Sequence, residues 1–168
     1  MPELELSAQR DFWLSAEDSV LLRDCRFEAF HASGHGGQKV NKSSSAVRVT
    51  HLPSGLSASS QESRSQAENR VKALKRLRLE MAFCIRKEPQ GGFALEPAPA
   101  ERNPSYPQYV ACLLDALSAA EWDLKASALA LGASPSRLAK LLARSPRLWQ
   151  ELQAQRAKCG LPSLRPVS

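Results

Sequence analysis

Glycine is concentrated in one short stretch of this chain, residues 33–42, which reads Ser-Gly-His-Gly-Gly-Gln-Lys-Val-Asn-Lys. Gly34, Gly36 and Gly37 fall within four consecutive positions. Glycine lowers stability unless the backbone must adopt a positive φ or come very close to another molecule. Glycines at this density therefore indicate a loop that is pressed against a partner, and not a segment of the core.

The sequence patterns of several common enzyme classes are missing. No Gly-Lys-Ser/Thr follows the glycines, as a nucleotide-binding P-loop would require, and no serine lies in a Gly-x-Ser-x-Gly elbow. The four cysteines, at positions 25, 84, 112 and 159, have no zinc-site spacing. His51 falls between a predicted strand and a turn, where we expect a structural or surface residue and not a general base. No metal or cofactor is predicted.

Two strands and a long helix are predicted to carry the glycine-rich stretch. Residues 25–32 and 46–51 have strand patterns, with Val47 and Val49 on the buried side. Pro53-Ser54-Gly55 predicts a turn into a returning strand over 56–61. A helix is expected over 65–86 with an apolar stripe of Ala67, Val71, Leu74, Leu77, Met81 and Ile85. Its other faces carry basic residues, and this excess of positive charge favours phosphate contact. They are Arg64, Arg70, Lys72, Lys75, Arg76 and Arg78.

The first residues are expected to be less ordered. Residues 1–14 are interpreted as a loose arm with Phe12 and Trp13 as a docking point. Ser15 has the residue type of an N-cap, and a short helix is predicted over 16–23.

The second half of the chain is predicted to be helical. Proline and glycine are frequent over 87–107, which is typical of a linker. Helices are predicted from Tyr106, over 124–131, over 135–143 and from Pro146, because Ser-Pro pairs open the last two. The predicted fold is therefore α+β: a small mixed β-sheet with a packing helix in domain 1–88, a linker over 89–104, and a small all-α unit over 105–168.

The segment 128–142 has the pattern of a helix-turn-helix, with a small alanine, a glycine turn and a capping serine. A plain helical bundle explains the same residues, and the sequence leaves both interpretations open. Basic residues dominate from position 137 onward, which favours nucleic acid contact through Arg137, Lys140, Arg144 and Arg147.

The composition also favours a polyanionic partner. The formal net charge is +6 and the isoelectric point about 9.4, values typical of nucleic acid-binding proteins among others. No signal peptide or membrane-spanning stretch is recognisable. We expect a cytoplasmic, monomeric protein with reduced thiols.

The glycine-rich stretch belongs to a longer pattern. It is followed by Ser-Ala-Val-Arg-Val-Thr-His-Leu-Pro-Ser-Gly over 45–55, and then by Gln61, Arg64-Ser65-Gln66 and Asn69-Arg70. Over residues 24–82, this run closely resembles the catalytic domain of the class I peptide-chain release factors.

The resemblance implies hydrolysis of the ester between nascent peptide and tRNA in the ribosomal peptidyl-transferase centre, with ribosomal RNA and peptidyl-tRNA as partners. Gly36, Gly37 and Gln38 would carry the catalytic role. The Gln38 backbone N–H would stabilise the developing oxyanion and its side chain would line a water site. The family counterpart of Gln38 is commonly N5-methylated, so the same modification is expected here. Other positions would shape the loop or hold RNA: Ser33, Gly34, Lys39, Asn41, Lys42, Arg48, Arg64, Ser65, Gln66, Asn69 and Arg70.

Release factors that read stop codons carry a large domain before this one, whereas only about 25 residues precede it here. The chain is therefore more similar to the short, codon-independent members that rescue stalled ribosomes, and translation termination or rescue is the expected function. Two alternatives remain: a non-catalytic ribosome- or RNA-binding relative, and a DNA-binding regulator that uses the helix-turn-helix-like segment.

Overall fold

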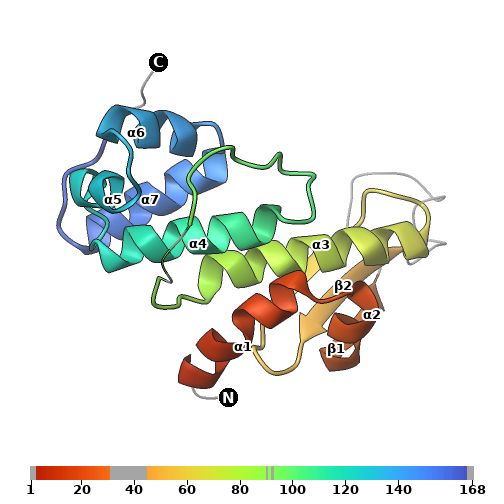
Figure 1. Cartoon of the computed structure of the whole chain (residues 1–168). Helices are drawn as coiled ribbons and strands as arrows, with labels where there is room; N and C mark the ends of the chain where they lie inside the picture. The colour runs from red at the N-terminus through yellow and green to blue at the C-terminus, as the bar shows by residue number, and fades with distance from the viewer. Residues whose placement is uncertain (1–2, 31–44, 90, 92, 166–168) are drawn as a thin grey trace. The chain divides into compact units, whose positions relative to one another are not determined.

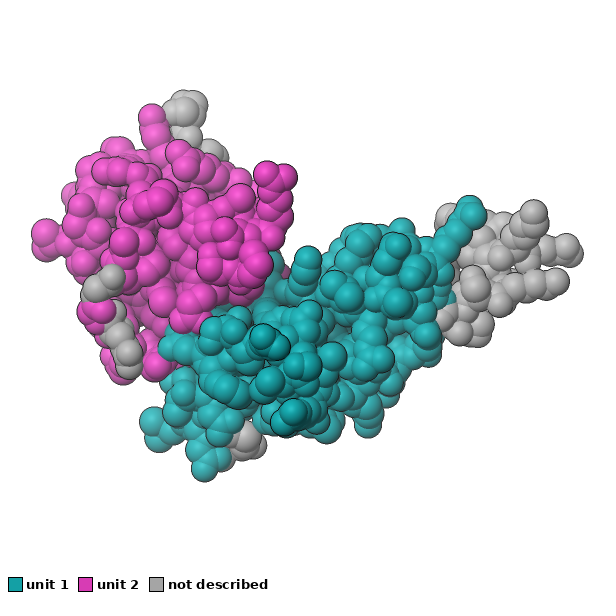
Figure 2. All heavy atoms as spheres, turned by 45° about the vertical axis from the view of Figure 1, so that its right-hand side comes forward, with its two compact units in different colours: residues 1–85 teal, residues 86–168 magenta. Residues whose placement is uncertain are grey.

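The computed structural model describes residues 3–30, 45–89, 91 and 93–165. The chain divides into two compact units, residues 1–85 and 86–168, which are coloured separately in Figure 2. In the described residues, the first unit contains a sheet and a long helix, and the second contains four helices (Figure 1). This is the α+β class that the sequence predicts.

A three-stranded sheet forms the first unit's centre, in the order β1-β2-β3. Its strands are β1 (Cys25–Phe30), β2 (Ala46–His51) and β3 (Ser57–Ser60). Both pairings are antiparallel. The sequence predicted a mixed sheet, and this detail of the prediction is wrong. The alternation predicted for β2 is confirmed, because Val47 and Val49 are buried while Arg48 is exposed. The predicted turn is also confirmed: Gly55 has φ +71° and donates its N–H to the His51 carbonyl at 2.8 Å.

Helix α3 (Gln66–Cys84) packs on β2 and β3 (Figure 1). Leu74, Leu77 and Met81 of the predicted stripe are buried, as is Ile85 just beyond the helix. The stripe fails at its beginning, where Val71 is 47% exposed. The first turns of α3 therefore do not pack an apolar side on the sheet. They place polar side chains near the strand ends.

The prediction that residues 1–14 form a loose arm is wrong. Residues Glu3–Ser15 form helix α1, which lies beside α3 (Figure 1). Trp13 is 1% exposed and places its ring edge-on to His51, with centroids 4.4 Å apart. Ser15 ends α1 and is not an N-cap, because its Oγ donates back to the Asp11 carbonyl at 2.8 Å. The predicted helix over 16–23 is shorter, with α2 at Asp18–Leu21 and a 3₁₀ turn at Leu22–Asp24.

Arg78 was expected on the outer, basic side of α3, and this prediction is wrong. Its side chain is buried, and its guanidinium donates to the carbonyls of Trp13 and Ala16 and pairs with Asp18. A buried guanidinium must be paired and hydrogen-bonded to be tolerated. Arg78 therefore holds the α1–α2 connection against α3 and is not available to a phosphate.

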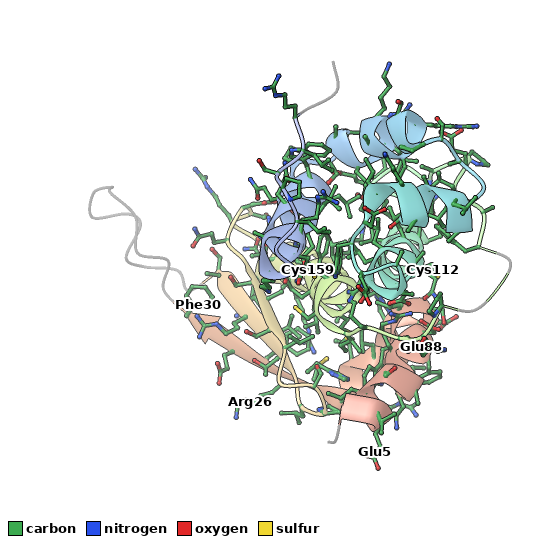
Figure 3. All side chains as sticks on the ribbon, turned by 90° about the vertical axis from the view of Figure 1, so that its left-hand side faces the viewer. Glu5, Arg26, Phe30, Glu88, Cys112 and Cys159 are labelled. Carbon is green, nitrogen blue, oxygen red and sulfur yellow. The ribbon has the colours of Figure 1, made fainter. Side chains whose placement is uncertain are left out.

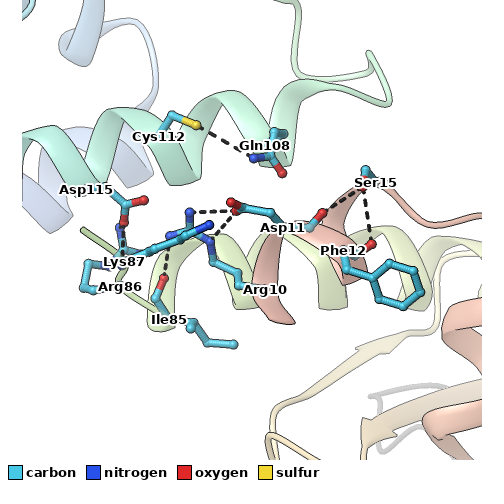
Figure 4. A network of polar contacts seen from close by, with 10 residues as sticks. All are labelled: Arg10, Asp11, Phe12, Ser15, Ile85, Arg86, Lys87, Gln108, Cys112 and Asp115. Carbon is cyan, nitrogen blue, oxygen red and sulfur yellow. Dashed lines mark hydrogen bonds and ion pairs between the residues drawn. The ribbon is translucent and has the colours of Figure 1, made fainter. Parts of the chain in front are cut away.

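Arg10 has a similar role just beyond the C-terminal end of α3. It is 1% exposed and donates from Nη1 to the Ile85 carbonyl at 3.1 Å, while its Nε and Nη2 face the Asp11 carboxylate (Figure 4). The end of α3 is thus joined to α1 through a charged hydrogen bond.

The second unit confirms the predicted helices closely. They are α4 (Tyr106–Ala119), α5 (Leu124–Ala130), α6 (Pro135–Ala143) and α7 (Pro146–Lys158). Ser134 caps α6 by accepting the Arg137 N–H at 3.2 Å, and Gly132, with φ +63°, ends α5. The core is largely leucine, contributed by Leu113, Leu114, Leu117, Leu138, Leu142 and Leu152.

The described residues between 86 and 105 contain no helix or strand. Their beginning is held by Asp115 of α4, which accepts the Lys87 N–H at 3.0 Å and faces Arg86 at 3.5 Å (Figure 4). Within the described part of the chain, no helix is both long and apolar enough to cross a bilayer.

Candidate functional site

The predicted catalytic stretch connects two paired strand ends. Phe30, the last residue of β1, pairs with Ala46, the first of β2, so the two ends of the intervening segment start from neighbouring positions (Figure 3). The predicted site residues Ser33, Gly34, Gly36, Gly37, Gln38, Lys39, Asn41 and Lys42 lie outside the described residues. The described part of the site is therefore the frame at the strand ends.

Asn69 of α3 is the central group of this frame. It is completely buried, and its Nδ2 donates to the carbonyls of Ser45 and Ser63, each at 2.7 Å. Its Oδ1 accepts from the Ser63 N–H at 2.9 Å and the Ser60 Oγ at 3.2 Å. These four bonds use the full capacity of an amide side chain. Asn69 thus joins helix α3 to the start of β2, the end of β3 and the connection between β3 and α3.

Ser65 and its neighbours begin the helix that carries Asn69. The Ser65 Oγ accepts the Glu68 N–H at 3.3 Å as the N-cap, and the Ser65 N–H donates to Ser63 Oγ at 3.0 Å. Arg64 and Gln66 on either side are exposed. The structure therefore gives Ser65 a role in fixing the helix start, whereas RNA contact by Arg64 and Gln66 stays a prediction.

Arg48 and Arg70, both predicted to hold RNA or shape the loop, cover phenylalanines of β1. The Arg70 guanidinium carbon lies 3.9 Å from the Phe27 ring centroid, and that of Arg48 lies 5.4 Å from the Phe30 centroid. Phe27 pairs with Val49 and so lies on the α3 side of the sheet, whereas Arg48 is on the other face. The structure does not bring the two arginines onto one surface.

Glu62 neutralises part of the basic side of α3. Its carboxylate pairs with Arg76 and, at 3.2 Å, with the Lys72 Nζ. The Lys72 hydrogen bond and the Arg76 charge lower the pKa of Glu62. Arg76 also donates to the Ser59 carbonyl at 2.7 Å, so it ties α3 to β3. The predicted phosphate-binding row on α3 is therefore partly occupied by internal pairs.

His51 and Cys25 are not prepared for catalysis. His51 is fully buried, its Nδ1 lies 2.8 Å from the Ser54 Oγ, and burial lowers its pKa, which keeps the ring neutral at pH 7. Burial is also the main cause that raises the pKa of Cys25 to about 11, so its thiol stays protonated. Of the two roles that the sequence left open for His51, the structural one is confirmed, because a buried residue is not a surface residue.

Sequence reasoning missed the partners in this frame. Ser45, Ser60 and Ser63 act with Asn69, and Phe27 and Phe30 act with the arginines. The only available signal was the short spacing between Ser63 and Asn69, six positions. In the second unit, Arg137, Lys140 and Arg144 lie on or just after α6, and Arg147 lies in the first turn of α7.

Replacing Asn69 with alanine should lower the free energy of unfolding of the first unit by about 2–4 kcal/mol, because buried partners lose their hydrogen bonds. Hydrogen exchange of β2 and α3 amides measures the change. Gln66→Ala, on the exposed side of the same helix, is the control and should stay within about 0.5 kcal/mol of wild type. Equal effects of the two substitutions would contradict a central role for Asn69.

This region of the chain is similar to known proteins. Residues 16–92 match the family model of the RF-1 domain. The peptide chain release factor 1 of Syntrophus aciditrophicus is 57% identical over 72 residues, which cover 43% of this chain and 20% of that protein. The release factor 1 of Enterococcus faecalis is 49% identical over 93 residues, covering 55% of this chain and 24% of the relative.

A peptide chain release factor 2, from Thermomicrobium roseum, is 49% identical over 79 residues, which cover 44% of this chain and 21% of the relative. The chain thus spans between a fifth and a quarter of the length of these relatives. The matched segment contains the sheet, α3 and the whole glycine-rich stretch. Residues 16–92 therefore match the RF-1 domain model and are similar in sequence to segments of peptide chain release factors 1 and 2.

Proposed function

We propose that this protein hydrolyses the ester bond of peptidyl-tRNA on the ribosome. The observation that carries the proposal is the Gly36-Gly37-Gln38 sequence inside a matched RF-1 domain. The anchored strand ends support it, because Asn69 fixes the chain at Ser45, one residue before β2. A rigid support beneath a connecting segment is what presentation of a reactive tip requires.

The proposed chemistry needs little from side chains. Water attacks the carbonyl carbon of the ester, negative charge develops on the carbonyl oxygen, and the bond to the tRNA ribose oxygen breaks as that oxygen takes up a proton. The backbone N–H of Gln38 would donate to the oxyanion, and its neutral side chain would position the water. Gly36 and Gly37 would permit the close approach. The remaining groups would come from ribosomal RNA and tRNA.

We further propose that release by this protein does not depend on a stop codon. The described residues before the matched segment support this proposal, because they do not form a separate codon-reading domain. They form α1, which packs on α3 and contributes Trp13 to the core of this same unit. These residues thus serve the RF-1 domain itself. The second unit is wholly helical in its described secondary structure.

Release of labelled peptide from purified ribosomal complexes tests both proposals. We expect equal rates from complexes with a stop codon, a sense codon or no codon in the decoding site. Gln38→Ala should slow all three, whereas Gln150→Ala, at an exposed position of α7, should not. Release that requires a stop codon would contradict codon independence. Ribosome binding without release from any complex would contradict the hydrolase and favour a non-catalytic relative.

A further inference from the structure

The second unit contains a long segment without acidic residues. From position 124 to 150 the sequence has no Asp or Glu but contains Lys125, Arg137, Lys140, Arg144 and Arg147. All of these except Arg147 are exposed, and Arg147 is half-buried. The segment comprises α5, α6 and the beginning of α7. One sign of charge therefore dominates this part of the surface.

Helix α6 concentrates this charge on one side. Its apolar side chains Leu138, Ala139, Leu141 and Leu142 are buried, so the opposite side faces solvent. Arg137, Lys140 and Arg144 follow one another at spacings of three and four, which places them as neighbours along the same side. We name these three residues the α6 basic face.

Neutralisation of the α6 basic face is incomplete. Arg137 pairs with Glu96, whose pKa is lowered mainly by that hydrogen bond and also by the charges of Arg137 and Arg144. Among the described residues, Lys140 and Arg144 form no ion pair. In contrast, the buried Arg156 of α7 is committed to the carbonyls of Trp122 and Pro162. Buried arginine in this unit serves the fold, while Lys140 and Arg144 remain for an external anion.

We propose that the α6 basic face docks on the phosphate backbone of a ribosomal RNA duplex. The choice of RNA rests on the proposed function. Helix α6 carries no Asn, Gln, Asp or Glu, so only its basic side chains and Ser136 could contact base edges, whereas the basic side chains bind phosphates whatever the sequence. The deep, narrow major groove of an RNA helix does not admit such side chains to the bases, which leaves the backbone as the partner.

Binding of the full chain to a fluorescent RNA hairpin duplex, measured over a series of salt concentrations, tests the inference. The double variant Lys140→Glu/Arg144→Glu should bind more weakly, and its plot of log affinity against log salt should be shallower by about two, one for each lost phosphate contact. The control is Lys158→Glu/Arg165→Glu, which makes the same charge change at two exposed positions outside the α6 basic face. It should retain most of the wild-type affinity and slope.

Three results would overturn the inference: equal losses in both double variants, no loss in the first, or tighter and sequence-selective binding to a DNA duplex. Peptide release separates this inference from the proposed function. The first double variant should raise the ribosome concentration needed for half-maximal release and leave the maximal rate unchanged, whereas Gln38→Ala lowers the maximal rate. If the wild-type protein releases peptide but does not bind the duplex, only the docking inference is contradicted. If it binds the duplex but does not release peptide, only the proposed hydrolase function is contradicted.

Discussion

Gly37→Ala should lower the maximal rate of peptide release by roughly 10²- to 10³-fold, the loss typical when one oxyanion donor is removed. In the proposed mechanism that donor is the backbone N–H of Gln38, the next residue. An added Cβ at position 37 would stand where main chain must approach the ester, and it would disfavour backbone conformations that only glycine adopts freely. A single-turnover measurement with saturating protein isolates this loss from any loss of ribosome binding.

Gly91→Ala is the matched control for the added methyl group. A Cβ built at Gly91 meets nothing within 4 Å, and its φ lies outside the left-handed region. This variant should release peptide at the wild-type rate. Wild-type release by Gly37→Ala would contradict the proposed role of the tip, while equal losses in both variants would point to a general effect of the substitution.

The parts of the fold that the sequence predicts well depend on neighbouring residues. Alternation of Val47, Arg48 and Val49 identifies β2, and Ser134-Pro135 marks the start of α6 to the residue. Gly55 and Gly132 both have the positive φ that their turns require. Such signals act over a few positions, and a single sequence therefore suffices to detect them.

The parts that it misses depend on contacts between distant residues. Helix α1 has Phe12, Trp13 and Leu14 at consecutive positions and not along one side of a helix, so nothing local shows that Trp13 reaches His51. Arg78 belongs by spacing to a basic helix side, but the carbonyls at Trp13 and Ala16 hold it in the interior. These contacts become visible only when α1 and α3 are brought together.

In the candidate site, too, the local motif could be predicted from the sequence and the long-range contacts could not. The Gly36-Gly37-Gln38 sequence is recognisable because residue types alone carry it. The frame beneath it was not, since Asn69 acts through backbone carbonyls, at Ser45 and Ser63, whose residue types do not matter to the bond. A pattern of residue types could place Asn69 near the site but could not distinguish loop support from RNA contact.

Trp13→Ala should lower the free energy of unfolding of the first unit by about 3–5 kcal/mol, the usual loss for a buried aromatic residue. Trp13 is 1% exposed, and its ring contacts that of His51, which lies in β2 beside the predicted turn. The substitution removes this contact and leaves a cavity where α1 joins the sheet. Since small domains are stable by about 5–15 kcal/mol in total, the loss should be visible as faster hydrogen exchange throughout β2 and α3.

Phe12→Ala separates a core role for Trp13 from the docking role that the sequence suggested. Phe12 is the adjacent aromatic residue on α1 and is 57% exposed, so its removal should change the free energy of unfolding far less. If residues 1–14 were instead a loose arm, neither substitution would alter exchange in β2. Equal small effects would therefore contradict the packing of α1. A large effect of Trp13→Ala alone would make α1 part of the support that holds β2, the strand that follows the proposed catalytic stretch.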